Sequence, residues 1–337
     1  MRVSDKTTSR NFLNYLNNAK TNFAKTNERV ASGKRFKRIS EDVSAGTRVL
    51  RVRGDLKKTE EYLDNVKSIN EELSVTENAL SYVNEKLVQA HTRIVKGLND
   101  PSGASGRGAI ANEISAIKKE ILQYANTRYN NKFVLGGSAS ASAPFTIGAD
   151  GKLLYNGIDV DEIKQNNDGS FYYGTPPNPI PMDGELYADI GLGLKMTGSN
   201  VQTDTAFKAS YSGLEILGFG KDNDGTTKNL YNLLSDIENT LRSGNMESLG
   251  KLDAILVDST DRFGKFVTDI GTKTNFLDSI ETRAKSSIDS YKKQINNLMG
   301  IDDAEEAANQ TLNDYVLKAV LRMGSDILPL SLMDFLN

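Results

Sequence analysis

Few residues of this chain have the type and spacing that catalysis or metal binding requires. His91 is the only histidine, and cysteine is absent. A zinc protease motif needs two histidines one helical turn apart, and thiolate chemistry needs cysteine. His91 follows Ala90 within a helical pattern, where a lone histidine is usually a surface or packing residue. We therefore expect no catalytic residue, no metal ligand and no cofactor, and we expect the chain not to be an enzyme.

One short run resembles part of a calcium-binding loop. Residues 221–225 read Lys-Asp-Asn-Asp-Gly. An EF-hand frame ending at Gly225 would place Gly220 at the first ligand position and Tyr231 at the last, and neither supplies a carboxylate. A simple turn is the better interpretation of this run.

A basic stretch from Lys34 to Arg53 has the composition of a nucleic-acid patch. It is diluted by Glu41 and Asp42, and the chain as a whole has a net charge of -3. Phe36 is the only aromatic residue in the stretch, whereas single-stranded nucleic acid is usually bound on several aromatic faces. We expect this stretch to face solvent or a neighbouring subunit and not nucleic acid.

The elements that would position these residues are predicted to be helices. Apolar residues recur every three or four positions in two regions far apart in the sequence, and such a seam buries only against another helix. The first seam is Val66, Ile69, Leu73, Leu80, Val83, Leu87, Ala90 and Ile94, and the second is Leu277, Ile280, Ala284, Ile288, Tyr291, Ile295 and Leu298. We expect the two seams to pair. The predicted fold is mainly α, an elongated antiparallel helical bundle or coiled-coil rod formed by the N- and C-terminal segments.

The centre of the chain has a different composition. Residues 137–214 contain five of the seven prolines. Short apolar runs there are separated by turn dipeptides, which is typical of β-hairpins; the dipeptides are Asp150-Gly151, Asn156-Gly157, Asp168-Gly169 and Asp183-Gly184. We expect a central β-rich insert that faces the surface and can be removed without loss of assembly.

These patterns predict three discontinuous domains. Residues 1–40 and 301–337 would form a terminal helical domain, residues 41–136 and 215–300 a helical rod, and residues 137–214 the insert. Ser40 is predicted to cap a long helix, with acidic residues in its first turn. The first residues lack the apolar core of a cleaved signal peptide, and no apolar run has the length of a membrane span.

The terminal helices are predicted to form an assembly surface. Each has an apolar stripe wider than one partner helix can cover, and the tail is too apolar to face water. The predicted surface consists of Phe12, Leu16, Ala19, Phe23, Val30, Leu312, Tyr315, Val316, Leu317, Ala319, Val320, Leu328, Leu332 and Phe335.

Several of these segments together resemble the flagellin superfamily. The resemblance lies in the turn Glu28-Arg29-Val30-Ala31-Ser32-Gly33-Lys34-Arg35, in Phe133-Val134-Leu135-Gly136-Gly137, in Asn275-Phe276-Leu277, and in the tail that ends Met333-Asp334-Phe335-Leu336. This chain departs from the family at Ser40-Glu41-Asp42-Val43, where Ser-Asp-Asp-Pro is usual. The short tail favours a hook–filament adaptor over a filament subunit.

The resemblance implies a structural protein of the extracellular flagellum that joins hook to filament through its paired terminal helices. The implied partners are a hook-associated protein on the hook side, flagellin on the filament side, further copies in a ring, and a cytosolic export chaperone on the C-terminal helix. Nucleic acid and membrane insertion are not implied. Export would use the flagellar secretion apparatus without a cleaved signal peptide. Two alternatives stay open: a polymerising filament flagellin, and an unrelated coiled-coil scaffold.

Overall fold

The computed structural model of the chain divides into two compact units. One consists of residues 1–60 and 286–337, and the other of residues 61–285. The structure describes residues 2–99, 103–137, 142–166, 170–175, 177–180, 186–198, 200–202 and 205–333, without the side chains of residues 2–6, 200 and 325–333.

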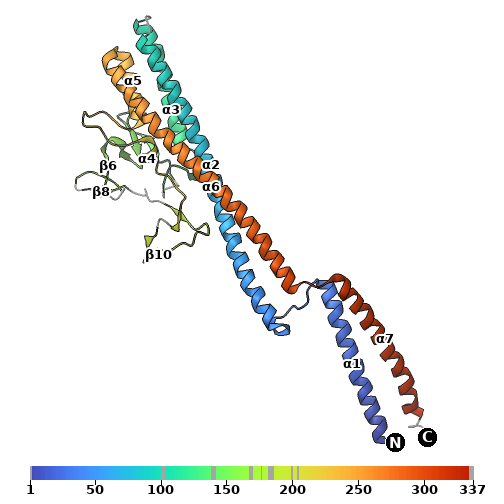
Figure 1. Cartoon of the computed structure of the whole chain (residues 1–337). Coiled ribbons are helices and arrows are strands. Elements are labelled where there is room, and N and C mark those ends of the chain that lie inside the picture. Colours follow the sequence, from blue (N-terminus) through green and yellow to red (C-terminus); the bar gives the residue numbers. More distant parts are fainter. Residues whose placement is uncertain are drawn as a thin grey trace. The chain divides into compact units, whose positions relative to one another are not determined.

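Long helices make up most of the described chain (Figure 1), which confirms the mainly α prediction. The α-helices are α1 (Arg2–Ser32), α2 (Val43–Asn99), α3 (Gly103–Ala125), α4 (Gly213–Leu217), α5 (Leu230–Ser243), α6 (Met246–Met299) and α7 (Asp303–Met333). Two 3-10 turns, η1 (Ile39–Glu41) and η2 (Val160–Glu162), complete the helical elements of the described residues.

The start of α2 differs from the predicted cap. Ser40 lies within η1, and α2 begins at Val43. The cap is supplied by Asp42, whose Oδ1 accepts a hydrogen bond from the backbone nitrogen of Ala45 at 2.9 Å. A carboxylate at this position satisfies a free amide of the first turn and also favours the positive end of the helix. The prediction for Ser40 was wrong by two residues.

In the larger unit, α2 and α6 run antiparallel (Figure 1). Asn70 of α2 donates a hydrogen bond to Asp278 of α6 at 2.8 Å, and His91 contacts Asp253 at 2.8 Å. Residue numbers therefore rise along α2 as they fall along α6. Every residue of the first predicted seam is buried, from Val66 to Ile94. The two predicted seams therefore pair only where they overlap, near Leu73 and Leu277. The rest of the first seam lies opposite the part of α6 around Asp253, which precedes the second predicted seam.

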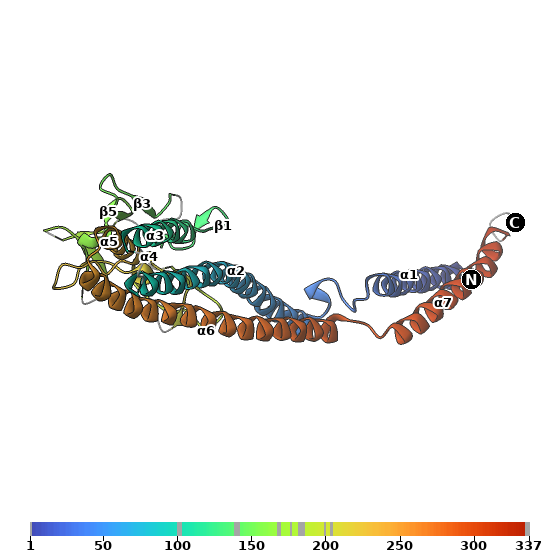
Figure 2. The ribbon, with the colours of Figure 1, turned by 90° about the horizontal axis from the view of Figure 1, so that it is seen from above.

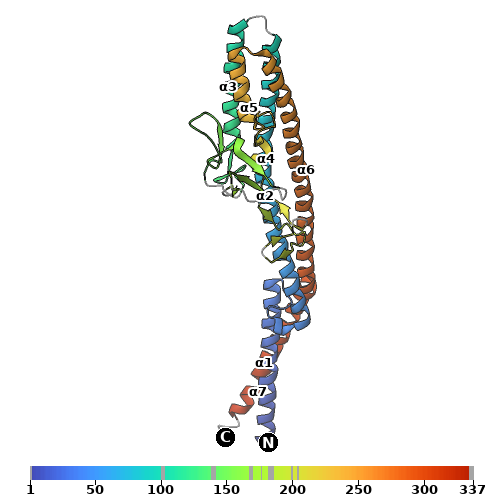
Figure 3. The same cartoon turned by 90° about the vertical axis from the view of Figure 1, so that its left-hand side faces the viewer.

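Helices α3 and α5 complete the helical part of this unit and lie side by side (Figure 3). The chain breaks between α5 and α6 at Gly244, whose φ of 80° places it in the left-handed region. Glycine adopts this conformation without strain and commonly ends a helix. The position of this break was not predicted from the sequence.

The central insert forms small antiparallel sheets, as its turn dipeptides predict. Its sheets have the orders β3-β4-β5, β6-β7-β8, β12-β9 and β10-β11, and the hairpin β1-β2 precedes them. The strands are β1 (Arg128–Tyr129), β2 (Lys132–Phe133), β3 (Phe145–Ile147), β4 (Leu153–Tyr155), β5 (Ile158–Asp159), β6 (Ile163–Gln165), β7 (Phe171–Tyr173), β8 (Asn178–Pro179), β9 (Tyr187–Ala188), β10 (Met196–Thr197), β11 (Asn200–Val201) and β12 (Phe207–Lys208). Asn156 and Gly157, both with positive φ, connect β4 to β5. The predicted turns at Asp168-Gly169 and Asp183-Gly184 lie outside the described residues.

The insert is packed more deeply than the sequence suggests. Its strands gather beside α3, α4 and α5 (Figure 2), and Phe145, Leu153 and Tyr155 are each at most 1% exposed. These side chains belong to the same hydrophobic cluster as Ile114 of α3 and Leu230 of α5. The insert therefore covers apolar surface of the helices, which conflicts with the expectation that it is freely removable.

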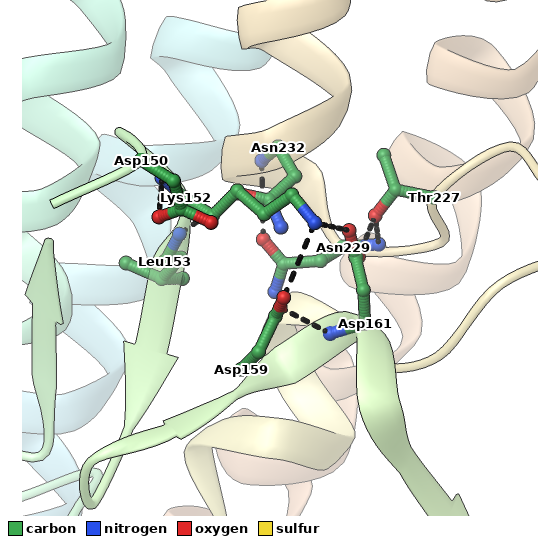
Figure 4. A network of polar contacts seen from close by, with 8 residues as sticks. All are labelled: Asp150, Lys152, Leu153, Asp159, Asp161, Thr227, Asn229 and Asn232. Atoms are coloured by element: carbon green, nitrogen blue, oxygen red, sulfur yellow. Dashed lines mark hydrogen bonds and ion pairs between the residues drawn. The ribbon is translucent and has the colours of Figure 1, made fainter. Parts of the chain in front are cut away.

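A polar network joins the insert to the start of α5 (Figure 4). The Asn229 side chain caps α5 by accepting hydrogen bonds from the backbone nitrogens of Tyr231 and Asn232. Asn232 Oδ1 in turn accepts a hydrogen bond from the backbone nitrogen of Leu153 in β4 at 2.9 Å. Because these groups are buried, each hydrogen bond is costly to lose. The network fixes the position of β4 on the helices.

Candidate assembly surface

The smaller unit is built around the antiparallel pair of α1 and α7, which lie side by side (Figure 1). Polar contacts hold one half of the pair in register. Asn313 donates a hydrogen bond to Thr26 Oγ1 at 3.2 Å, and Gln310 donates one to Asn27. Arg29 forms an ion pair with Glu306 at 3.6 Å. The two ends of the sequence thus meet in one helix pair.

The other half of the α1–α7 pair is apolar. Ala19 is buried, and Phe12, Leu16 and Phe23 are half-buried on the same face of α1. Gly324 of α7 is buried against Phe12, since a Cβ on Gly324 would come 2.3 Å from the Phe12 ring. Glycine here allows close approach of the two helices. Four of the predicted α1 residues therefore lie within the pair.

The predicted residues of α7 divide between two faces. Leu317 and Val320 are half-buried on the face toward α1. Leu312, Tyr315 and Val316 are exposed by 59%, 71% and 40% respectively. On α1, the predicted residue Val30 is also exposed, by 37%. The side chains of Leu328 and Leu332, and Phe335 entirely, lie outside the described residues.

Four apolar residues of α7 form a second seam, which we call the α7 stripe and define as Leu312, Val316, Ala319 and Met323. Their spacing of four, three and four residues is that of a coiled-coil seam. It lies on a different side of the helix from Leu317, because each residue advances about 100° around an α-helix. Leu312, Val316 and Met323 are all exposed, and Ala319 is half-buried. The α7 stripe thus has the pattern of a helix-packing face but no helix of this chain on it among the described residues.

A small apolar cluster lies where the segment after α1, the start of α2 and the end of α6 meet in this unit. Phe36, Ala45, Val49 and Met299 are buried together. Arg35 donates a backbone hydrogen bond to Met299 at 2.7 Å, next to the bridge between Lys34 and Gly300. This cluster anchors the segment that follows α1 to the end of α6.

The basic stretch is partly neutralised within the chain. Arg35 forms an ion pair with Asp42 at 2.9 Å, and Lys37 forms one with Glu28 at 2.8 Å. The hydrogen bond from Lys37 lowers the pKa of the exposed Glu28 carboxyl below its ordinary value. These pairs agree with a solvated charged surface in this region.

The remaining candidate sites are structural. The nitrogen Nδ1 of His91 lies 2.8 Å from Asp253, so this histidine links two helices. The run that resembles a calcium loop is a turn, in which Gly225 donates a backbone hydrogen bond to Asp222 at 3.0 Å. Among the described residues no cluster of histidines and carboxylates could hold a metal ion. No helix in the described part of the chain is long and apolar enough to span a membrane.

Sequence reasoning missed the polar half of the α1–α7 pair. Thr26, Asn27, Gln310 and Asn313 do not follow an apolar period, so periodicity gives no signal for them. Their contacts join positions 283 and 287 residues apart in sequence. Leu321, which is 50% exposed, was also absent from the predicted surface.

Over part of its length the chain is similar to known flagellar proteins. Residues 3–140 match the model of the bacterial flagellin N-terminal helical region. Over 171 residues the chain is 25% identical to flagellar hook-associated protein 3 of Escherichia coli, covering 50% of this chain and 53% of that protein. Over 139 residues it is 26% identical to a flagellin of Clostridium tyrobutyricum, covering 41% of this chain and 37% of that protein. The chain thus spans about half the length, or less, of these curated relatives.

A solved structure supports the fold. A Vibrio parahaemolyticus protein described as a flagellar hook-associated protein superposes with a TM-score of 0.59 at 16% identity, covering 77% of this chain and 100% of that one. At this identity the likeness concerns the fold, a set of long helices with a β-rich insert. Together with the sequence matches it confirms the resemblance predicted from the sequence.

Proposed function

Because residues 3–140 match the model of the bacterial flagellin N-terminal helical region, we propose that the chain is a structural protein of the flagellum that joins hook to filament. The α7 stripe carries this proposal. It offers a helix-packing seam that α1 leaves uncovered, and exposed apolar seams of this kind mark contacts between proteins. Assembly through the terminal helices would bury it.

The proposed partners follow from this role. A hook-associated protein would lie on one side, flagellin on the other, and further copies of the chain would complete a ring. A cytosolic export chaperone would cover the C-terminal helix before export through the flagellar secretion apparatus. The protein would then act outside the cell, as a binding component without catalysis.

A filament flagellin is the second candidate, supported by the similarity to the Clostridium tyrobutyricum flagellin. The two functions differ in self-assembly. A filament subunit polymerises alone in solution, whereas an adaptor stays at one junction. Sedimentation of the purified chain at high concentration, with electron microscopy of the pellet, distinguishes them, because long filaments would favour the flagellin.

The test of the adaptor function is Leu312→Asp in a strain that depends on this chain. Leu312 is 59% exposed, so the charge should not disturb the α1–α7 pair. Burying an unpaired carboxylate in a contact between subunits should cost several kcal/mol. We expect the variant to fold normally but to leave hooks without filaments and flagellin in the medium.

The matched control is Thr311→Asp. Thr311 is exposed and adjacent, but it lies about 100° around the helix from Leu312 and therefore off the α7 stripe. This variant should assemble and swim normally. Normal swimming of Leu312→Asp, or equal loss in both variants, would contradict the assignment of the α7 stripe as the assembly contact.

A further inference from the structure

The larger unit contains a pocket that the proposed structural role does not use. It has a volume of about 860 Å³ and lies among β6, the segment 218–228 and one face of α6. This volume is in the range of pockets that bind small organic ligands, and it far exceeds what a bare anion fills. We call it the Arg262 pocket, after the side chain that α6 contributes to it.

Positive charge gathers around the Arg262 pocket. Arg262, Lys164, Lys221 and Lys228 all line it. None of the four forms an ion pair with another described residue, so their charges are not neutralised by contact. Like charges held close together repel one another, and this repulsion is relieved when an anion binds.

The two carboxylates at the pocket already have partners. Asp161 accepts a hydrogen bond from the Thr227 hydroxyl, and only 5% of its side chain is exposed. Glu215 forms an ion pair with Lys208 at 3.8 Å. The balance of charge available to a ligand in the pocket is therefore positive.

Arg262 has unused hydrogen-bonding capacity. Of the five N–H donors of a guanidinium, one has an acceptor within the described residues, the backbone oxygen of Lys228 at a long 3.4 Å. Its Nε is shielded from solvent and has no partner. A carboxylate can accept two parallel hydrogen bonds from a guanidinium, which is the strongest pairing available to this group.

Part of the pocket wall is apolar. Phe219 and Phe266 line it, and Phe171 packs edge-on against Phe219 with ring centroids 4.9 Å apart. Gly218 lies close to the Lys228 backbone and to the Arg262 side chain, since a Cβ there would lie 2.2 Å from the Lys228 oxygen and 3.0 Å from Arg262 Nη2. Phenyl faces beside a guanidinium suit a ring that has one apolar face and one acidic group.

We propose that the Arg262 pocket binds a carboxylated sugar. The carboxylate would pair with Arg262 and the surrounding lysines, and the C–H face of the sugar ring would lie on Phe219 and Phe266. Glu215 also lines the pocket, and its carboxylate can accept hydrogen bonds from sugar hydroxyls. A bare phosphate or sulfate would use the charge but neither the aromatic wall nor this carboxylate.

The experiment is isothermal titration of the full chain at low salt with glucuronic acid and with N-acetylneuraminic acid. Glucose, which has the neutral ring, and inorganic phosphate, which has the charge alone, are the comparison ligands. We expect at least one acidic sugar to bind at least ten times more tightly than glucose or phosphate. Binding should weaken as salt rises, because charge contributes to it.

Arg262→Gln should reduce affinity for that acidic sugar at least tenfold. The matched control is Arg283→Gln, since Arg283 is exposed on the same helix and does not line the pocket. Both variants should keep the circular dichroism spectrum of the parent and support normal swimming, so this test is independent of the adaptor function. Absence of binding by both acidic sugars, equal binding of phosphate, or full affinity in Arg262→Gln would overturn the proposal.

Discussion

Replacing Asn229 with alanine should lower the free energy of unfolding by about 3 kcal/mol. Asn229 is fully buried, and its side chain makes hydrogen bonds in two directions. Its Oδ1 accepts from the backbone nitrogens of Tyr231 at 3.0 Å and Asn232 at 3.3 Å, which caps α5. Its Nδ2 donates to the backbone oxygen of Gly218 at 2.7 Å. Alanine would remove all three hydrogen bonds. The backbone groups that form them would stay buried, where water cannot replace the lost partner.

The magnitude follows from two contributions. Loss of an asparagine N-cap costs about 0.5–2 kcal/mol, and a buried polar group left without a partner costs about 1–3 kcal/mol. Asn229→Ser keeps an oxygen for the cap and loses only the bond to Gly218, so it should cost about 1–2 kcal/mol. Asn245→Ala is the matched control, because the exposed Asn245 caps α6 through Ser248 at 3.1 Å. Its loss should cost at most about 1 kcal/mol, since water can replace the bond.

Urea unfolding measures these differences. The chain has no tryptophan, so tyrosine fluorescence and far-ultraviolet circular dichroism are the two probes. Their transitions must coincide before a two-state free energy is extracted, and the slope with urea must stay constant among variants. A cost below about 1 kcal/mol for Asn229→Ala, or one equal to that of Asn245→Ala, would refute the argument that burial makes this cap expensive.

Two further predictions concern the same unit. Burial raises the pKa of Glu238, but hydrogen bonds from Arg242 and Lys118 outweigh it and hold the pKa below its ordinary value. The resulting stability is present above the unfolded pKa of about 4.3 and is lost as pH falls through the folded pKa. The Glu238→Gln variant should therefore be less stable than the parent at neutral pH, and its stability should fall less than that of the parent as the solution is made acidic. Parallel pH profiles of the two unfolding midpoints would contradict this. Deleting residues 138–214 should lower the unfolding midpoint or prevent folding, because it uncovers the helices. An unchanged urea midpoint would show that the insert contributes nothing to the core.

The helical seams could be predicted because their signal is local. Val66, Leu73 and Leu87 repeat with the period of the helix itself, and all three are buried as expected. The exposure of the α7 stripe follows from the same reasoning, because a helix with one partner helix can bury only one of its two apolar seams. Local periodicity was therefore enough to predict the helices and to suggest the candidate assembly surface.

Features that depend on contacts between residues far apart in sequence could not be predicted from local periodicity. The contact of Asn232 with Leu153 joins residues 79 positions apart, and neither residue type indicates the other. The burial of Phe145 and Tyr155 against the helices also depends on such distant contacts. Because this burial could not be predicted, the insert looked separable. The cap at Asp42 was missed for a different reason, because Ser40 and Asp42 are both good caps and only the η1 turn decides between them.

The pairing of α1 with α7 also determines when this part of the protein can fold. α1 is complete after the first 32 residues, whereas α7 begins at Asp303. At about 5–20 residues per second, a ribosome takes tens of seconds between the two, and during that interval α1 lacks its α7 partner. Contacts that join residues this far apart also form slowly, because a long loop must close first. The α1–α7 pair therefore cannot form before α7 has been synthesised, which leaves α1 open to a chaperone or to another copy during that time.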